Sequence, residues 1–137
     1  MTAVERKILV VDDEVEVCNF VKMFFEERGF SVFEAHDGDE AVKVAREKKP
    51  QVILLDIRMR TNEEGFLVVP RLREAAPGAK ILAVTAVEDE ASVLRGKALG
   101  MDDYITKPLI LEYLEKTVLR KIQEATSSNA PSRDIPT

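Results

Sequence analysis

The sequence predicts an α/β fold in which a doubly wound parallel sheet of five strands carries helices on both faces. Short continuous apolar runs, such as residues 8–11 and 52–55, are typical of strands that are buried on both faces. Segments with apolar residues at helical spacing alternate with these runs five times. Five strand–helix units favour an open sheet over a barrel, because a barrel needs eight.

The first two units are defined by apolar spacing and by residues that end helices. We expect the first strand at residues 6–11 and the first helix at residues 14–28, ended by Gly29. A second, shorter strand is expected at residues 30–34. The helix after it starts at residues 37–39 and stops before Pro50, because the residue before a proline disfavours helical geometry. The expected inner face of the first helix consists of Val17, Phe20, Val21, Phe24 and Phe25.

The last three units follow the same order. The expected strands are residues 51–55, 80–84 and 103–106, and the helices are residues 65–76, 89–99 and 109–125. Gly100 closes the fourth helix. The apolar stripe of the last helix is Leu111, Leu114, Val118, Leu119 and Ile122. Residues 126–137 are polar and aperiodic, so we expect one domain over residues 1–125 and then a disordered tail or the start of a linker.

Composition narrows the class of protein. The net charge of −5, with no block of lysine and arginine, argues against direct nucleic-acid binding. No apolar stretch approaches the roughly 18 residues that span a bilayer, and no signal peptide is visible, so we expect a cytoplasmic protein without a membrane segment. Cys18 is the only cysteine, which excludes an internal disulfide and a cysteine metal cluster. We expect no catalytic role for the single histidine, His36.

Polar side chains follow four of the expected strands. Asp12 and Asp13 come after the first, and single residues follow three others: Asp56, Thr85 and Lys107. Each residue could instead have a purely structural role. The aspartates could cap helices, the threonine could be a strand-end hydroxyl, and the lysine could be a surface residue. Because parallel strands open onto one crevice at their carboxyl ends, a single shared site explains all five positions together.

The residue types of this site suit phosphoryl transfer to a carboxylate. Three crowded carboxylates repel one another and raise the pKa of at least one unless a cation lies among them. Oxygen ligands favour Mg²⁺, and an aspartate can act as a nucleophile on phosphorus. Lys107 can neutralise a phosphoryl oxygen, and the Thr85 hydroxyl with the Ala86 backbone N–H can bind another.

Four segments resemble the receiver domain of two-component response regulators. They are residues 8–14 (ILVVDDE), 54–59 (LLDIRM), 84–86 (VTA) and 100–108 (GMDDYITKP), within a resemblance over about residues 5–124. The resemblance implies a flavodoxin-like, CheY-like sheet with strand order 2-1-3-4-5. It also implies that Asp56 is the phosphoacceptor and that Asp12, Asp13 and the backbone carbonyl of Arg58 help to hold Mg²⁺. Thr85 and Lys107 then sense the phosphoryl group, and Tyr104 matches the family's switch aromatic.

The same resemblance implies a signalling function. A histidine kinase or histidine phosphotransfer protein would give its phosphoryl group to Asp56, and the face of the fourth helix, fifth strand and fifth helix would signal to an output protein or a second receiver. Such a domain is not an enzyme beyond its own phosphorylation and dephosphorylation. We expect the kinase to dock on the outer side of the first helix, at Val15, Cys18, Asn19 and Lys22. We also expect a cis peptide bond between Lys107 and Pro108.

The loop after Asp56 departs from the family pattern. Arg60 stands where a proline is usual, Glu64 stands where an aspartate is usual, and the loop is one residue longer. This departure keeps open a phosphorylation-independent adaptor as the alternative function. A phosphatase of the haloacid dehalogenase class needs an acid at Arg58, which cannot supply a proton. A flavin carrier is disfavoured because the acidic residues after the first strand would repel the flavin phosphate.

Overall fold

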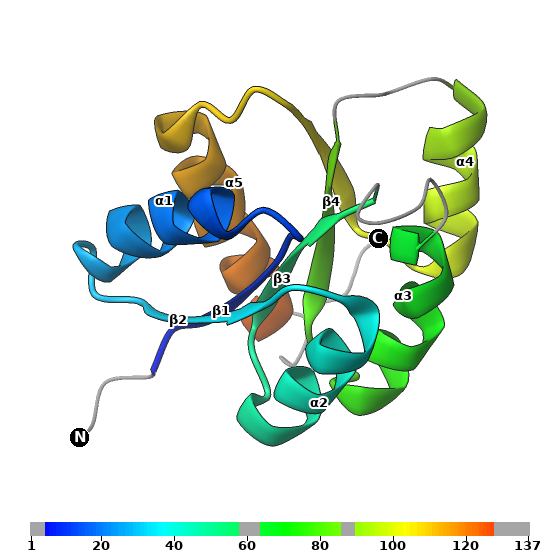
Figure 1. Cartoon of the computed structure of the whole chain (residues 1–137), viewed down its shortest axis with the longest axis horizontal. Coiled ribbons are helices and arrows are strands. Elements are labelled where there is room, and N and C mark those ends of the chain that lie inside the picture. Colours follow the sequence, from blue (N-terminus) through cyan, green and yellow to red (C-terminus); the bar gives the residue numbers. More distant parts are fainter. Residues whose placement is uncertain (1–4, 58–63, 86–89, 128–137) are drawn as a thin grey trace.

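The computed structural model describes residues 5–57, 64–85 and 90–127, which form one parallel sheet flanked by five helices (Figure 1). The strand order is β2-β1-β3-β4-β5, so the expected fold class and topology are confirmed. The strands are β1 (Lys7–Val11), β2 (Ser31–Ala35), β3 (Val52–Asp56), β4 (Lys80–Thr85) and β5 (Asp103–Thr106). The helices are α1 (Val15–Glu26), α2 (Gly38–Lys48), α3 (Glu64–Ala75), α4 (Glu90–Leu99) and α5 (Leu111–Ser127).

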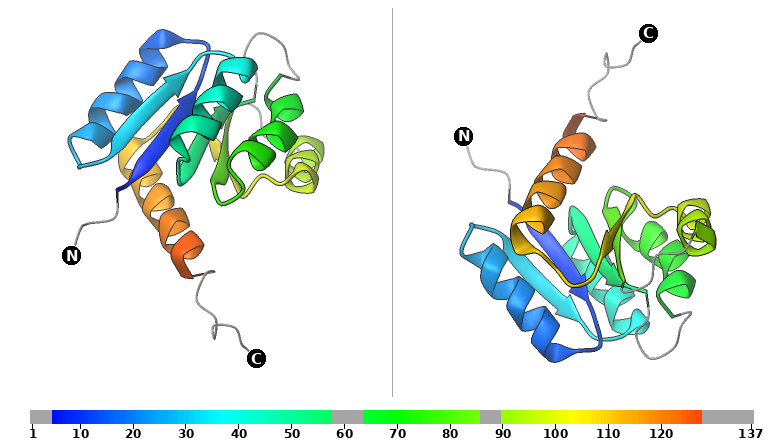
Figure 2. Two further views of the ribbon diagram at one scale, coloured as in Figure 1. Left: turned by 90° about the horizontal axis from the view of Figure 1, so that it is seen from below. Right: turned by 90° about the horizontal axis from the view of Figure 1, so that it is seen from above.

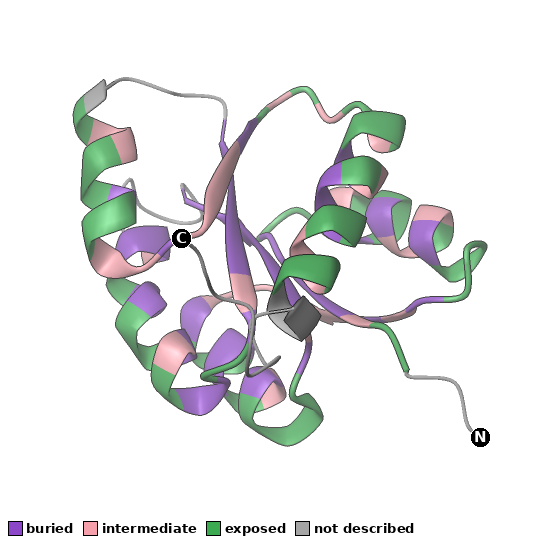
Figure 3. Cartoon of the chain, turned by 180° about the vertical axis from the view of Figure 1, so that it is seen from behind, coloured by how far each residue is buried: buried purple, intermediate pink, exposed green. Residues whose placement is uncertain are grey.

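Helices cover both faces of the sheet: α1 and α5 lie on one, and α2, α3 and α4 on the other (Figure 2). Alternate residues of each strand point to opposite faces, so the strands contribute to two separate cores. Leu9, Ile53 and Ile81 pack toward α2 and α3, whereas Ile8, Leu54 and Leu82 pack toward α1 and α5. Figure 3 shows buried residues along the strands and exposed residues on the outer sides of the helices.

The strand register aligns the carboxyl ends of the central strands. Val11 lies opposite Leu55, Asp56 opposite Val84, and Thr85 opposite Thr106. The residue after β1 and the last residues of β3 and β4 therefore meet at one edge of the sheet. Gly100 directly follows α4 and has the positive φ of a helix-ending residue, 106°, so the helix end expected there is confirmed. The first helix ends at Glu26 rather than at residue 28, and Gly29, with a φ of 87°, lies in the turn that follows.

Helix bounds differ from the expected ones mainly at the ends. The first helix begins at Val15 and the last at Leu111, and the last continues to Ser127, beyond the expected domain end at residue 125. Residues 128–137 of the expected tail lie outside the described residues. Within the described ranges, no helix is long and apolar enough to cross a membrane.

One residue expected on the inner face of α1 is exposed. Phe20 has 53% of its surface accessible, and the buried line of the helix is instead Cys18, Val21 and Phe25. These positions follow helical spacing, whereas Phe20 is rotated about 200° from Cys18 around the helix axis. The expectation was wrong for this residue: Phe20 lies at helical spacing from Val17 and Phe24, but both of these are only half-buried, so Phe20 falls beyond the edge of the buried face. Similarly, Leu119 lies at the edge of its stripe, with Leu114 and Val118 fully buried.

The two phenylalanines give a matched test of this assignment. Phe25 is fully buried and packs edge-on against Phe24 and Phe30, with ring centroids 5.1 Å apart in both pairs. Phe25→Ala should lower the free energy of unfolding by about 3–5 kcal/mol, measured by urea denaturation. Phe20→Ala should change it by no more than about 0.5 kcal/mol. Equal losses in the two variants would contradict the observed orientation of α1.

Candidate functional site

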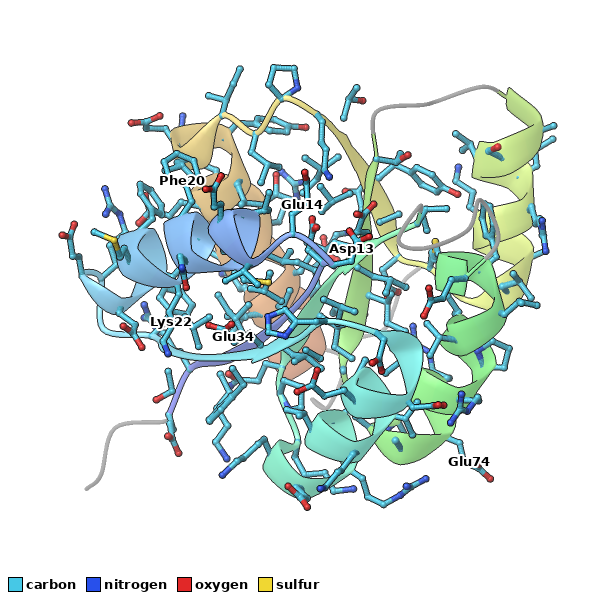
Figure 4. All side chains as sticks on the ribbon, in the orientation of Figure 1. Asp13, Glu14, Phe20, Lys22, Glu34 and Glu74 are labelled. Atoms are coloured by element: carbon cyan, nitrogen blue, oxygen red, sulfur yellow. The ribbon has the colours of Figure 1, made fainter. Side chains whose placement is uncertain are left out.

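Three aspartates meet at the carboxyl edge of the sheet. Asp12 and Asp13 follow β1, and Asp56 is the last residue of β3. Each contributes a carboxylate oxygen to a group whose atoms all lie within 4.8 Å of one another. Asp12 and Asp56 are buried, with 2% and 5% of their surfaces exposed, and Asp13 faces solvent beside them (Figure 4). The structure therefore brings together the three acids singled out in the sequence.

Lys107 extends its ammonium group into this acidic pocket. Its Nζ lies 3.4 Å from Asp12 Oδ2 and 3.6 Å from Asp56 Oδ2. Its backbone N–H donates to the Thr85 carbonyl, 2.8 Å away, and the peptide bond to Pro108 is cis, as expected. Burial lowers the pKa of the lysine, but the charges of Asp56 and Asp12 outweigh burial and raise the pKa above its ordinary value. The side chain is therefore a fixed cation at neutral pH.

The buried acid after β1 has two roles. Asp12 Oδ1 accepts a hydrogen bond from the backbone N–H of Glu14, 2.9 Å away, and its Oδ2 faces Lys107. Glu14 is the N-cap residue of α1 and its own side chain makes no capping hydrogen bond. Asp12 thus supports the start of α1, as the structural alternative predicted, and its second carboxylate oxygen still faces the pocket.

Thr85 completes the described part of the site. It is the last residue of β4, is 3% exposed, and lies in register with the strand that leads to Lys107. The two remaining groups expected here, the carbonyl of Arg58 and the N–H of Ala86, lie outside the described residues. The three acids all supply oxygen ligands, and the positive charge of Lys107 offsets only part of their negative charge. The pocket is therefore suited to a hard divalent cation such as Mg²⁺.

The altered loop ends in a tight contact between α3 and the end of β3. The Gly65 N–H donates to the Ile57 carbonyl over 2.9 Å, and a Cβ atom at this glycine would clash with the backbone of Asp56 and Ile57. Glu64, which replaces the usual aspartate, reaches across to α2, where its Oε2 accepts from the Gly38 N–H at 3.0 Å. The longer acid therefore stabilises the amino-terminal end of α2. Arg60 lies outside the described residues.

The expected switch aromatic, Tyr104, contacts α4. Its hydroxyl donates to the Ser92 carbonyl over 2.6 Å, and its half-buried ring packs against the core beneath α2 and α3. Gly96 allows this position, because a Cβ atom there would clash with the tyrosine ring and hydroxyl. The position of α4 is thus tied to the position of this ring.

The structure corrects one expected docking residue on α1. Val15 and Asn19 are exposed and Lys22 is half-buried, with its Nζ 4.0 Å from Glu34 Oε2. Cys18 is fully buried, and its thiol donates to the Asp12 carbonyl over 3.5 Å. Burial, followed by the nearby charges of Glu34 and Asp12, raises the pKa of the thiol to about 12. A partner cannot contact this side chain, because the residue lies on the inner line of α1.

Comparisons with known proteins agree with this geometry. The family model for the response regulator receiver domain matches residues 8–119. The chain is 36% identical over 132 residues to the alkaline phosphatase synthesis transcriptional regulatory protein PhoP of Bacillus subtilis, covering 94% of this chain and 55% of that protein. It is 33% identical to ResD of the same organism, covering 96% of this chain and 56% of ResD. The chain thus spans about half the length of these curated relatives.

Solved structures lead to the same family. Chemotaxis protein CheY4 of Vibrio cholerae is 30% identical with a TM-score of 0.80, covering 85% of this chain and 98% of that one. A Burkholderia pseudomallei response regulator was solved with a phosphorylated aspartic acid and a calcium ion. It is 26% identical with a TM-score of 0.79, and the match covers 97% of this chain and 78% of that one. Since the family model matches most of the sequence, the chain belongs to the response regulator receiver domain family.

Proposed function

We propose that this receiver domain accepts a phosphoryl group on Asp56 from a phosphohistidine of a histidine kinase or histidine phosphotransfer protein. The observation that carries the proposal is the position of the Asp56 carboxylate. It is buried at the end of β3, 3.6 Å from the Lys107 ammonium and within 4.8 Å of two further acids. The Burkholderia relative, whose structure holds a phosphorylated aspartic acid, supports the same chemistry here.

The transfer step follows from these groups. A carboxylate oxygen of Asp56 attacks phosphorus, forming a new O–P bond, while the P–N bond of the phosphohistidine breaks and its electron pair leaves with the imidazole. Lys107 stabilises negative charge on the transferring group, and the Thr85 hydroxyl donates to another phosphoryl oxygen. Asp12, Asp13 and Asp56 would hold Mg²⁺, which neutralises phosphoryl charge when it is bound.

An intact set of reactive groups favours this function over a phosphorylation-independent adaptor. The Lys107 ammonium lies 3.4 Å from Asp12 and 3.6 Å from Asp56, and both acids are buried together with Thr85, although burying charged groups costs stability. An adaptor that had lost the chemistry would not need to retain them. The departure from the family pattern at Arg60 and Glu64 changes none of these residue types.

Mass spectrometry tests the phosphoacceptor. Acetyl phosphate with Mg²⁺ should add one phosphoryl mass to the protein, and Asp56→Asn or chelation of the metal should abolish the addition. Asp13→Asn should lower the metal affinity while leaving the acceptor in place, so labelling should require a higher Mg²⁺ concentration. Full labelling of Asp56→Asn would contradict the assignment, and no labelling of the unaltered protein would favour the adaptor.

We further propose that Thr85 and Tyr104 carry the signal from Asp56 to α4. Ala83 of β4 lies opposite Tyr104 of β5, and the tyrosine hydroxyl binds the Ser92 carbonyl of α4. If Thr85 moves toward the phosphoryl group, the tyrosine ring gains space to turn inward and releases that carbonyl. Closely packed elements move between discrete arrangements, so the face of α4, β5 and α5 would present a different surface to an output protein or a second receiver.

Beryllofluoride, a phosphoryl mimic, provides the test of coupling. In the unaltered protein it should shift the amide NMR signals of α4 and of residues around Tyr104. Thr85→Ala should still bind the mimic, because the aspartates and lysine remain, but should transmit much less of this change. The Tyr104→Phe variant, which lacks the hydroxyl, should show altered α4 signals before the mimic is added. An undiminished distal response in Thr85→Ala would exclude this route.

The kinase is proposed to dock on the exposed part of α1, at Val15, Asn19 and Lys22. Val15 is the first residue of the helix, close in sequence to Asp12, and is 53% exposed. An exposed apolar side chain beside the reactive carboxylate suits a transfer partner.

Charge substitution tests this docking surface. Val15→Asp should slow transfer from a cognate phosphohistidine protein about 10-fold or more while leaving acetyl phosphate labelling intact, since a buried charge at an interface is unfavourable. Leu94→Asp is the matched control, because Leu94 is a similarly exposed residue, 60%, on the distant α4. Equal slowing by the two variants would place the docking surface elsewhere.

A further inference from the structure

The chain's single cysteine and single histidine meet at a second cluster, away from the phosphorylation pocket. Cys18 lies on α1, Glu34 lies on the edge strand β2, and His36 follows that strand. Each contributes one ligand-type atom, and the three atoms lie within 4.8 Å of one another. The sequence pattern predicted no metal-binding role for either residue, because they are 18 positions apart and lie on different elements.

We propose that Cys18, Glu34 and His36 form a binding site for a borderline divalent cation of the Zn²⁺ type. A sulfur, a nitrogen and an oxygen ligand together suit Zn²⁺, whereas Mg²⁺ prefers oxygen alone. Three protein ligands leave a fourth tetrahedral position for water. The cluster and the aspartate pocket therefore select different metals by ligand type.

The side chains are placed so that a small movement would complete the site. In a tetrahedral zinc site the ligand atoms lie roughly 3.3–3.8 Å apart, given bonds of about 2.0–2.3 Å. His36 Nε2 is already 3.1 Å from Glu34 Oε1. Cys18 is fixed in the core, but the His36 and Glu34 side chains are 37% and 24% exposed and can adjust toward it. An ion would enter from the solvent side of β2, past these two residues.

A fourth residue is placed to orient the histidine. Glu40 Oε1 lies 3.7 Å from His36 Nδ1 and accepts a hydrogen bond from the His36 backbone N–H at 2.8 Å. Histidines that bind metal through one ring nitrogen commonly donate the other ring N–H to a carboxylate. With Nε2 toward the metal, Glu40 is therefore a positioning residue.

The local charge also favours a cation. Two carboxylates face the cluster: Glu34 Oε1 lies 3.1 Å from His36 Nε2, and Glu40 Oε1 lies 3.7 Å from His36 Nδ1. Lys22 offsets part of this field through its contact with Glu34, and the two side chains lie together between α1 and β2 (Figure 4). Cation binding would replace the S–H of Cys18 with an S–metal bond, the proton passing to solvent. This would remove the thiol's hydrogen bond to the Asp12 carbonyl.

Co²⁺ is a spectroscopic substitute for Zn²⁺ and is the probe for the test. The full chain is titrated with Co²⁺ in excess Mg²⁺, which keeps the aspartate pocket occupied by a hard cation. A sulfur-to-cobalt charge-transfer band should appear with one equivalent and disappear when Zn²⁺ is added. Because the chain has one cysteine, this band can arise only from Cys18. Absence of the band would overturn the proposal, including the case in which cobalt binds only at the aspartates.

Surface variants identify the other ligands even where Cys18→Ser fails to fold. His36→Gln and Glu34→Gln should each weaken Zn²⁺ binding, measured by competition with a chelating dye, by at least 10-fold. Glu40→Gln should weaken it by about 10–100-fold with the charge-transfer band retained. Glu16→Gln, at an exposed acid of the same helix α1, is the matched control and should leave Zn²⁺ affinity unchanged. Unchanged affinity in His36→Gln would overturn the proposal. Phosphorylation is not measured, so the outcome is independent of the function proposed for Asp56.

Discussion

The repulsion among three carboxylates at one edge of the sheet is the constraint on which the site depends. At an effective dielectric constant of about 20, two unit charges 4.8 Å apart repel by roughly 3–4 kcal/mol. Asp12 and Asp56 are both buried, so water screens this repulsion poorly. Lys107 contacts both of them but supplies one positive charge against three negative charges. The remaining negative charge is the reason why we propose that the pocket holds a divalent cation.

The packing and pairing of the strands hold these acids together in spite of the electrostatic repulsion among them. The three central strands β1, β3 and β4 are buried on both faces by two separate cores, and their backbone pairing fixes the register at their carboxyl ends. A shift of β3 by one residue would turn Asp56 to the other face and its apolar neighbours with it. The cores therefore stabilise the register, and the register places the acids.

The same packing links the pocket to its surroundings. Thr85 ends β4, and Tyr104 of the neighbouring β5 contacts α4, so these two strands form the route that we propose from the pocket to that helix. On the other face of the sheet, the Cys18 thiol donates a hydrogen bond to the Asp12 carbonyl from beneath α1. Two glycines allow close contacts on the α3 and α4 side of the sheet: Gly65 lets α3 approach the end of β3, and Gly96 lets α4 approach Tyr104.

Local patterns in the sequence were sufficient to predict the fold and most of the residues of the aspartate pocket. Apolar runs that end in Asp12, Asp56 and Thr85 define both the strands and the residues at their ends, because parallel strands share one open edge. The contacts made at the end of the loop after Asp56 could not be predicted from the sequence. Glu64 could be seen to replace an aspartate, but its hydrogen bond to the Gly38 N–H joins two helices far apart in the sequence.

The sequence by itself determined the α/β class, the order of the elements and the acids, hydroxyl and lysine of the pocket. Only the tertiary structure decided that Phe20 is exposed, that Cys18 is buried and that Cys18, Glu34 and His36 meet. The physical reason is the range of the interactions involved. Hydrophobic periodicity is a property of neighbouring residues, whereas the rotation of α1 on the sheet and the contact between α1 and β2 depend on packing between separate elements.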